Sequence, residues 1–286
     1  MPDMTPGTLY LVATPIGNLG DLSARAAKTL ADVDFIAAED TRVTRKLLEY
    51  LNIKKKLVSY YEHNKRDSGE KIISRLLSGE NCALVSDAGT PGISDPGMEL
   101  VHLCVEADIP MITIPGPCAA VAALTLSGLP TGRFAFEGFL SMSGKNRFSR
   151  LKELKTEKRT LIFYEAPHKL LRTLNDMLNI FGNRKITISR EMTKIHEETL
   201  RFTLAEAIDH FNKTPPRGEF VLIIEGSDDG ETSEPVMDIE QAAASAREYV
   251  DAGLSVKDAI KKIAEETGFP KNALYNAVVK KSNYIC

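Results

Sequence analysis

Three glycine- and proline-rich loops each follow directly after a short apolar, β-branched run. They comprise residues 14–20 (TPIGNLG), 86–97 (SDAGTPGISDPG) and 115–120 (PGPCAA). Glycine lets the backbone turn sharply and approach a ligand closely, and the small residues of the third loop open a helix whose amide donors face a ligand. One such loop is usually only a turn, but three at successive strand ends predict a ligand site. None matches GxGxxG or GxxxxGK[ST], which argues against a dinucleotide or a nucleoside triphosphate.

The elements that must position these loops alternate between strand and helix. Because strands that alternate with helices form a mostly parallel, covered sheet, we expect residues 1–129 to form an α/β domain. The strands are expected at residues 8–13, 33–38, 81–85 and 111–114, and the helices at residues 23–30, 42–51, 69–77 and 97–107.

A second α/β domain is expected over residues 130–226, followed by an acidic linker over residues 227–238. Residues 239–286 then read as a small helical unit with helix-turn-helix-like spacing, either a DNA-reading module or a packing or RNA-docking module. In the second domain strands are expected at residues 134–139, 160–164, 185–189 and 219–225, and helices at 147–154, 168–180 and 204–212. The last unit is expected to hold helices at 239–252, 256–267 and 272–280.

Composition narrows the cellular context. The four cysteines among 286 residues form no CxxC pair, so reduced thiols in a cytoplasmic protein are expected, with no metal site. We find no uncharged apolar run long enough to span a bilayer, which predicts no membrane association. The net charge of −3 does not point to a nucleic-acid partner, but it does not exclude one, because binding depends on where the charge lies.

Eight ordered motifs resemble one family. They read TPIGNL, AAEDTR, SDAGTPGISDPG, PGPCAA, EGFL, LIFYEAPH, SREMTK and GEFVLIIEG along residues 8–226. The chain resembles the ribosomal RNA small-subunit (cytidine-2′-O-)methyltransferases of the tetrapyrrole methylase superfamily. That resemblance implies two α/β domains with a cofactor cleft between them, plus the C-terminal helical unit. It also implies a homodimer that transfers the methyl group of S-adenosylmethionine to a cytidine ribose of 16S rRNA, either free or in the assembled 30S subunit.

The resemblance also assigns candidate cofactor residues. Asp87, Gly89 and Thr90 are expected to line the cofactor, with Asp87 near its polar end. Cys118 and Ala119 are expected to contact it through the backbone, and Gly17 and Tyr164 are expected nearby.

Methylation of a ribose hydroxyl would be helped by a positioned general base. Glu39 and Glu165, each at a strand end, are the preferred candidates, and Arg190 or Lys194 is a candidate to stabilise the developing alkoxide. A structural role is equally open, because Glu39 and Asp40, like Glu165, precede an expected helix that a carboxylate would stabilise. Asp40, His63, His168 and Glu191 are further candidates, and the sequence does not decide among them.

Two basic segments could contact RNA phosphates. Residues 42–75 carry ten basic and four acidic side chains, and residues 145–172 carry nine and three. Solvated helix faces are the ordinary explanation of either segment, but in a family that modifies RNA they favour binding. The candidate RNA-binding residues are Arg42, His63, Lys145, Arg147, His168 and Lys194.

Two other functions remain open. A methyltransferase of precorrins or other small molecules would share the cofactor loops, so these loops do not exclude it. Four other features favour an RNA substrate instead: the basic segments, the motifs AAEDTR and LIFYEAPH, and the C-terminal helices. A nucleic-acid-binding regulator with a degenerate cofactor cleft would differ in failing to bind S-adenosylmethionine.

Overall fold

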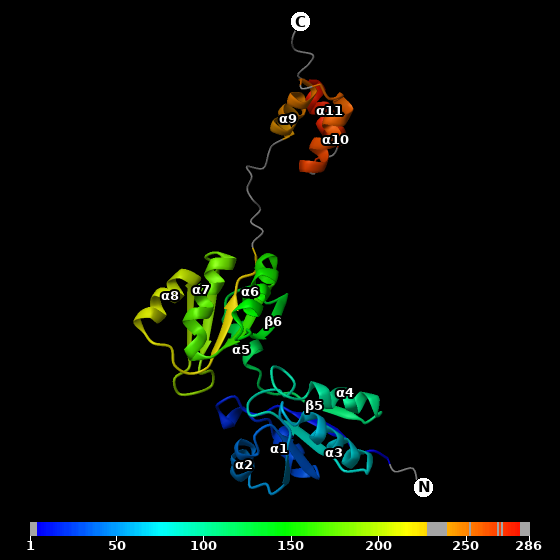
Figure 1. Cartoon of the computed structure of the whole chain (residues 1–286), viewed down its shortest axis with the longest axis vertical. Coiled ribbons are helices and arrows are strands. Elements are labelled where there is room, and N and C mark those ends of the chain that lie inside the picture. The colour runs from blue at the N-terminus through cyan, green and yellow to red at the C-terminus, as the bar shows by residue number, and fades with distance from the viewer. Residues whose placement is uncertain (1–4, 228–238, 252, 268, 270, 281–286) are drawn as a thin grey trace. The chain divides into compact units, whose positions relative to one another are not determined.

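The chain divides into two compact units, residues 1–227 and 228–286. The computed structural model describes residues 5–227, 239–251, 253–267, 269 and 271–280. The first unit contains two five-stranded sheets, which confirms the predicted α/β class (Figure 1). The acidic linker predicted over residues 227–238 lies, apart from its first residue, outside the described residues.

The first sheet is entirely parallel, with strand order β3-β2-β4-β1-β5. The inner strands β2 and β4 are buried at every position, because helices cover both faces of the sheet. Phe35 and Ala37 pack toward α3 and α4, whereas Ile36 and Ala38 pack toward α1 and α2. The strands are β1 (Leu9–Val12), β2 (Phe35–Ala38), β3 (Lys56–Ser59), β4 (Cys82–Val85) and β5 (Met111–Ile114), and the helices are α1 (Ala24–Asp32), α2 (Thr41–Tyr50), α3 (Lys65–Leu77) and α4 (Met98–Glu106).

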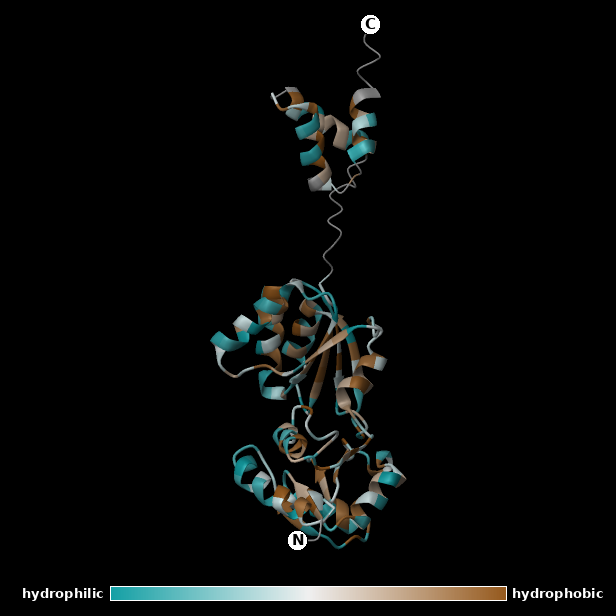
Figure 2. Ribbon diagram, turned by 90° about the vertical axis from the view of Figure 1, so that its right-hand side faces the viewer, coloured by the Kyte–Doolittle hydropathy of each residue, from teal (hydrophilic) through white to brown (hydrophobic). Residues whose placement is uncertain are grey.

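The second sheet is mixed, with strand order β6-β7-β10-β8-β9. Only β6 and β7 run parallel, and the other neighbours are antiparallel. Three helices cover one face around a large apolar core, and Figure 2 shows the strands of this sheet as predominantly hydrophobic. The strands are β6 (Phe134–Phe139), β7 (Thr160–Glu165), β8 (Lys185–Arg190), β9 (Glu198–Thr203) and β10 (Phe220–Ile224), and the covering helices are α6 (Gly144–Glu153), α7 (Leu170–Phe181) and α8 (Leu204–Lys213).

Helix α5 (Ala119–Leu126) covers the opposite face of the second sheet. Its Ala120, Ala123 and Leu124 pack against Ile162 of β7 and Val221 of β10. The chain therefore reaches the second sheet before residue 129, where the first domain was expected to end. This crossover makes the loop before α5 a direct link between the two sheets.

Two strands were not expected from the sequence. Both β3 and β9 are edge strands with little fully buried surface, so neither carries the continuous apolar run by which the inner strands were recognised. Helix α3 also begins at Lys65, four residues before the expected start.

The second unit contains α9 (Ile239–Asp251), α10 (Val256–Thr267) and α11 (Lys271–Lys280). Ala242, Ala243 and Ala246 place a small-residue face of α9 against Ile260, Ile263, Leu274 and Val278. Within the described part of the chain, no helix combines the length and the apolar character that crossing a membrane requires.

Candidate functional site

The three glycine-rich loops are held together by hydrogen bonds at the ends of β1, β4 and β5. Thr14 and Gly89 form a two-way backbone bridge, with N–O distances of 2.9 and 3.1 Å. Gly89 has a φ of +87°, a conformation that favours glycine. The Thr90 hydroxyl donates to the carbonyl of Pro117 at 3.0 Å. The loops predicted from sequence to share a ligand site are thus joined into one surface.

Contacts from the second sheet complete this surface. The Tyr164 hydroxyl, on β7, accepts a hydrogen bond from the Ala120 amide at 3.1 Å and so satisfies a donor in the first turn of α5. At the β6 bulge, Gly138 has a φ of +62°, and a Cβ there would lie 3.0 Å from Ser94 Oγ. Residues of the long loop after β4 therefore lie directly against strands of the second sheet.

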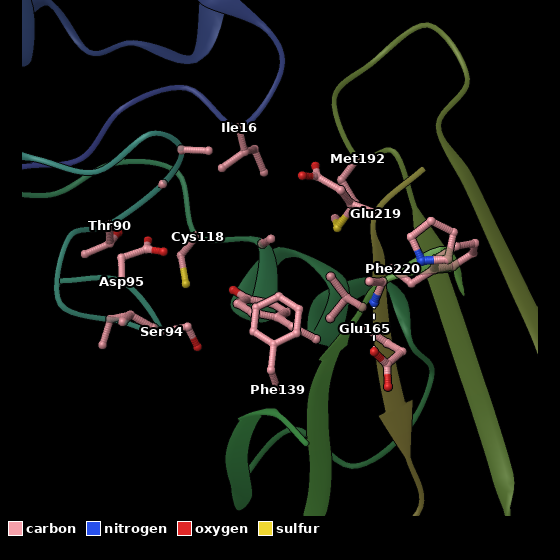
Figure 3. A pocket seen from close by; sticks show the side chains of 18 of the residues that line it. Ile16, Thr90, Ser94, Asp95, Cys118, Phe139, Glu165, Met192, Glu219 and Phe220 are labelled. Atoms are coloured by element: carbon pink, nitrogen blue, oxygen red, sulfur yellow. Dashed lines mark hydrogen bonds between the residues drawn. The ribbon is translucent and has the colours of Figure 1, made fainter. Parts of the chain in front are cut away.

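A cavity of about 520 Å³ lies where these loops and strands meet (Figure 3). Its walls are mainly apolar, and its polar groups come from the long loop after β4, the end of β7 and the segments beside β8 and β10. It is lined by Ile16, Ala88, Gly89, Thr90, Ile93, Ser94, Asp95, Cys118, Ala119, Phe139, Tyr164, Glu165, Ala166, Pro167, His168, Met192, Lys194, Glu219, Phe220 and Val221.

Five of the seven predicted cofactor residues line this cavity. They are Gly89, Thr90, Cys118, Ala119 and Tyr164. The structure does not bring Asp87 or Gly17 into the lining. The Asp87 carboxylate instead accepts from the Asp40 amide at 2.9 Å.

Gly17 allows a close approach by the loop after β8. A Cβ at Gly17 would lie 2.5 Å from Cγ of Lys194, so this glycine leaves room for the lysine side chain. Gly17 and Lys194 also line a neighbouring open hollow of about 650 Å³, and Lys194 lines the cavity as well.

The two carboxylates predicted as general bases have different surroundings. Glu165 lines the cavity and is buried, but both of its oxygens are engaged: Oε1 accepts from the Ala166 amide at 2.8 Å, and Oε2 accepts from the Thr173 hydroxyl at 2.6 Å. Glu39 is not in the cavity lining, and one of its oxygens accepts from the Asp87 amide at 3.3 Å. Burial raises the pKa of Glu39; the hydrogen bond from the Asp87 amide works against this rise, whereas the charges of Asp87 and Asp40 add to it.

Asp40 performs the structural role that the sequence left open. It caps α2 by accepting from the Arg42 amide at 2.8 Å, and it forms an ion pair with the exposed Arg42 side chain at 2.6 Å. The hydrogen bonds from Arg42 lower the pKa of Asp40 to about 2.

The candidate cations other than Arg147 divide into three groups. His63 and Lys145 are exposed, as is Arg42. His168 and Lys194 line the cavity, where Lys194 Nζ forms ion pairs with Glu191 at 3.0 Å and Glu219 at 2.8 Å. Arg190, the predicted alkoxide-stabilising residue, is outside the lining and forms an ion pair with Glu198 of β9 at 2.6 Å.

Arg147 requires a correction. Its side chain is only 4% exposed, and Nε forms an ion pair with Asp176 of α7 at 2.7 Å. The structure therefore does not support the predicted RNA contact, because this guanidinium is held inside the domain. The basic helix pattern was visible in the sequence, but the inward-facing position of this one residue was not.

Several lining residues were not identified from sequence. Phe139 ends β6, Met192 follows β8, Glu219 directly precedes β10, and Phe220 begins it. Asp95 lies within the loop of residues 86–97, one of the three loops predicted to bind a ligand. Burial, followed by the charge of Glu39, raises the pKa of Asp95 to about 6.

Comparison with known sequences agrees with this architecture. The family model of the tetrapyrrole (corrin/porphyrin) methylases matches residues 8–208. Ribosomal RNA small subunit methyltransferase I of Halalkalibacterium halodurans is 51% identical over 273 residues, covering 94% of each chain. The Bacillus subtilis protein of the same name is 47% identical over 273 residues, covering 95% of this chain and 94% of the relative.

Solved structures share the fold at low sequence identity. A cobalt precorrin-4 methyltransferase superposes with a TM-score of 0.58 at 15% identity, covering 76% of this chain and 94% of its own. A uroporphyrin-III C-methyltransferase of Thermus thermophilus, complexed with S-adenosylhomocysteine, has a TM-score of 0.54 at 17% identity. The superposition covers 77% of this chain and 97% of that structure. With the family match over most of its length, the chain belongs to the tetrapyrrole (corrin/porphyrin) methylases.

Proposed function

We propose that this protein is an S-adenosylmethionine-dependent methyltransferase of small-subunit rRNA that modifies the ribose 2′-hydroxyl of a cytidine. The observation that carries the choice of an rRNA substrate is the identity of about half over 94% of the chain to proteins named ribosomal RNA small subunit methyltransferase I. The tetrapyrrole-modifying enzymes match at only 15–20% identity and share the fold alone.

The cavity has the size and chemistry that S-adenosylmethionine requires. A volume of about 520 Å³ lies within the usual range for small-molecule sites. Apolar walls formed by Ile16, Met192 and Val221 suit an adenosine, and the Thr90 hydroxyl and the start of α5 supply polar groups. When bound, the cofactor supplies an electrophilic methyl group on a sulfonium.

The residues of this chain hold that cofactor and position the hydroxyl. Gly89, Thr90, Cys118 and Ala119 form the binding wall, and Tyr164 holds the start of α5 in place. Because the wall is built by hydrogen-bonded loops at strand ends, it is preorganised, and correct positioning alone supplies much of the rate enhancement.

The RNA would approach over basic surface. Arg42, His63 and Lys145 are exposed in the two basic segments, and His168 and Lys194 lie at the cavity itself. Phosphate contacts from such residues would supply sequence-independent affinity that falls with salt. We also expect a cytoplasmic homodimer, because rRNA is modified where the subunit is assembled and because the family resemblance implies a dimer.

The test is methyl transfer to rRNA from cells that lack the gene. With S-adenosylmethionine labelled in the methyl group, we expect label in a 2′-O-methylated cytidine after nuclease digestion, with free 16S rRNA and 30S subunits compared in parallel. Subunits from cells that contain the gene are the matched control and should accept no label, because their site is already modified.

Two outcomes would contradict the proposal. Absence of labelled ribose would exclude the RNA substrate, and label in a precorrin instead would assign the small-molecule activity. Calorimetry with S-adenosylmethionine distinguishes the RNA and small-molecule methyltransferases from a nucleic-acid-binding regulator with a degenerate cleft, because only an intact cavity binds the cofactor.

A further inference from the structure

Three carboxylates line the cavity: Asp95, Glu165 and Glu219. Glu165 accepts two hydrogen bonds, from the Thr173 hydroxyl and the Ala166 amide. Glu219 is mostly exposed, and its side chain forms an ion pair with Lys194. Both therefore already have polar partners, whereas Asp95 forms no ion pair in the described part of the chain.

Asp95 lies on the first-sheet wall of the cavity. Figure 3 shows it beside Thr90 and Ser94 of its own loop, whereas Glu165 lies with Phe220, its partner in the second sheet. The cofactor residues Gly89 and Thr90 belong to the same loop as Asp95. A proton acceptor at this position therefore lies next to the wall on which the methyl donor is expected to bind.

The groups that face Asp95 are mostly acidic. Glu39 at the end of β2 and Asp87 after β4 both oppose its ionisation, although less than burial does, while a hydrogen bond from Ser86 favours it. Tyr164 of β7 also interacts with it, and burial raises the pKa of that phenol to about 12, so Tyr164 stays neutral. Together these effects raise the pKa of Asp95 to about 6. A base whose pKa lies slightly below neutral is ionised at neutral pH and still accepts a proton readily.

We propose that Asp95 is the general base of the methyl transfer, an assignment that rests on the proposed function. The Asp95 carboxylate accepts the proton of the ribose 2′-hydroxyl. As that proton leaves, the oxygen forms its bond to the methyl carbon, and the carbon–sulfur bond of the sulfonium donor breaks with its electron pair passing to sulfur. The products are the methyl ether, the neutral thioether and the protonated Asp95.

The experiment compares single-turnover methyl transfer to unmodified 30S subunits by wild type and Asp95→Asn. The amide keeps the size of the side chain but does not accept the proton, so we expect the rate to fall about 100-fold or more. The dissociation constant for S-adenosylmethionine, measured by calorimetry, should not change. Asp95→Glu, which keeps a carboxylate, should restore part of the rate. Asp209→Asn, an exposed substitution on α8, is the matched control and should behave as wild type.

The pH profile separates proton transfer from a packing role. The wild-type rate should fall as pH falls through about 6, because the protonated carboxyl no longer accepts a proton. The residual rate of Asp95→Asn should lack this fall. His168→Gln tests the other titratable group at the cavity, and it should keep the fall.

Four results would overturn the assignment. They are a wild-type rate in Asp95→Asn, a loss of cofactor affinity in that variant, a fall at low pH that persists in it, or a fall that disappears in His168→Gln instead. If wild type fails to label rRNA at all, the proposed function itself fails and the assignment fails with it.

Discussion

Arg147 shows how the environment of a single residue decides its role. Its guanidinium is almost fully buried, and its Nε lies 2.7 Å from Asp176, whose side chain is 12% exposed. Nη1 also points to the carbonyl of Ser141 at 3.4 Å. A charge removed from water in this way is tolerated because it is paired, and loss of one partner leaves the other uncompensated.

Arg147→Met should therefore destabilise the protein without acting on RNA directly. We expect the free energy of unfolding, measured by urea denaturation, to fall by about 3–5 kcal/mol, because Asp176 remains buried without its partner. Replacing both residues, as Arg147→Met with Asp176→Leu, should recover much of that loss.

Lys145→Met on the same helix is the matched control. Lys145 is exposed, so its replacement should change stability by less than about 0.5 kcal/mol while weakening RNA binding. Equal stability losses in the two variants would contradict the assignment of Arg147 to the interior.

At the scale of elements, α5 is the segment that joins the two sheets. It follows the loop at the end of β5, packs on β7 and β10, and begins at the cavity wall. The hydrogen bond from the Ala120 amide to the Tyr164 hydroxyl links its first turn to the second sheet. The shape of the cavity thus depends on a contact between residues 44 positions apart.

Tyr164→Phe tests this link. Because the Ala120 amide would lose its acceptor at a partly buried position, we expect a loss of about 1–2 kcal/mol in the free energy of unfolding. The affinity for S-adenosylmethionine, measured by calorimetry, should fall as well, since α5 begins in the cavity wall.

Tyr50→Phe, at an exposed position at the end of α2, is the control and should change neither quantity. A Tyr164→Phe variant with unchanged stability and unchanged affinity would show that packing alone holds α5.

At the scale of the whole molecule, the two units have separate apolar cores. Both sheets and every residue that lines the cavity lie within residues 1–227, whereas α9–α11 pack around their own cluster. Since neither core draws on the other unit, folding of the first should not require the second.

A chain that ends at Ser227 should therefore fold and bind S-adenosylmethionine as the full chain does. We expect its melting temperature to differ by less than about 2 °C, because a change of 1 kcal/mol shifts a domain of this size by about 2–4 °C. Differential scanning calorimetry and cofactor titration, with the full chain as reference, measure both quantities.

The same pair of proteins shows what α9–α11 contribute. If the shortened chain binds the cofactor normally but methylates 30S subunits poorly, the helical unit serves the RNA. Loss of cofactor binding would contradict the independence of the first unit.

The sequence by itself determined the elements whose signal is local. Continuous apolar runs marked β2 and β4, because strands covered on both faces carry apolar residues at every position. The ligand loops could be located because they follow such strands directly, and the family resemblance then named Gly89, Thr90 and Cys118 within them. The edge strands β3 and β9 escaped prediction because polar residues on exposed edges leave no such run.

Only the tertiary structure decided the chemistry of the charged side chains. Asp95, Glu165 and Arg147 are each ordinary residues in a sequence, and their surroundings depend on neighbours that only folding places against them. Asp176 fixes Arg147, whereas Thr173 engages Glu165, and Glu39 with Asp87 disfavours ionisation of Asp95. The loop of residues 86–97 could thus be read as a ligand site from its glycines, but the raised pKa of its Asp95 arises from burial and from the charge of Glu39, which only the fold brings near it.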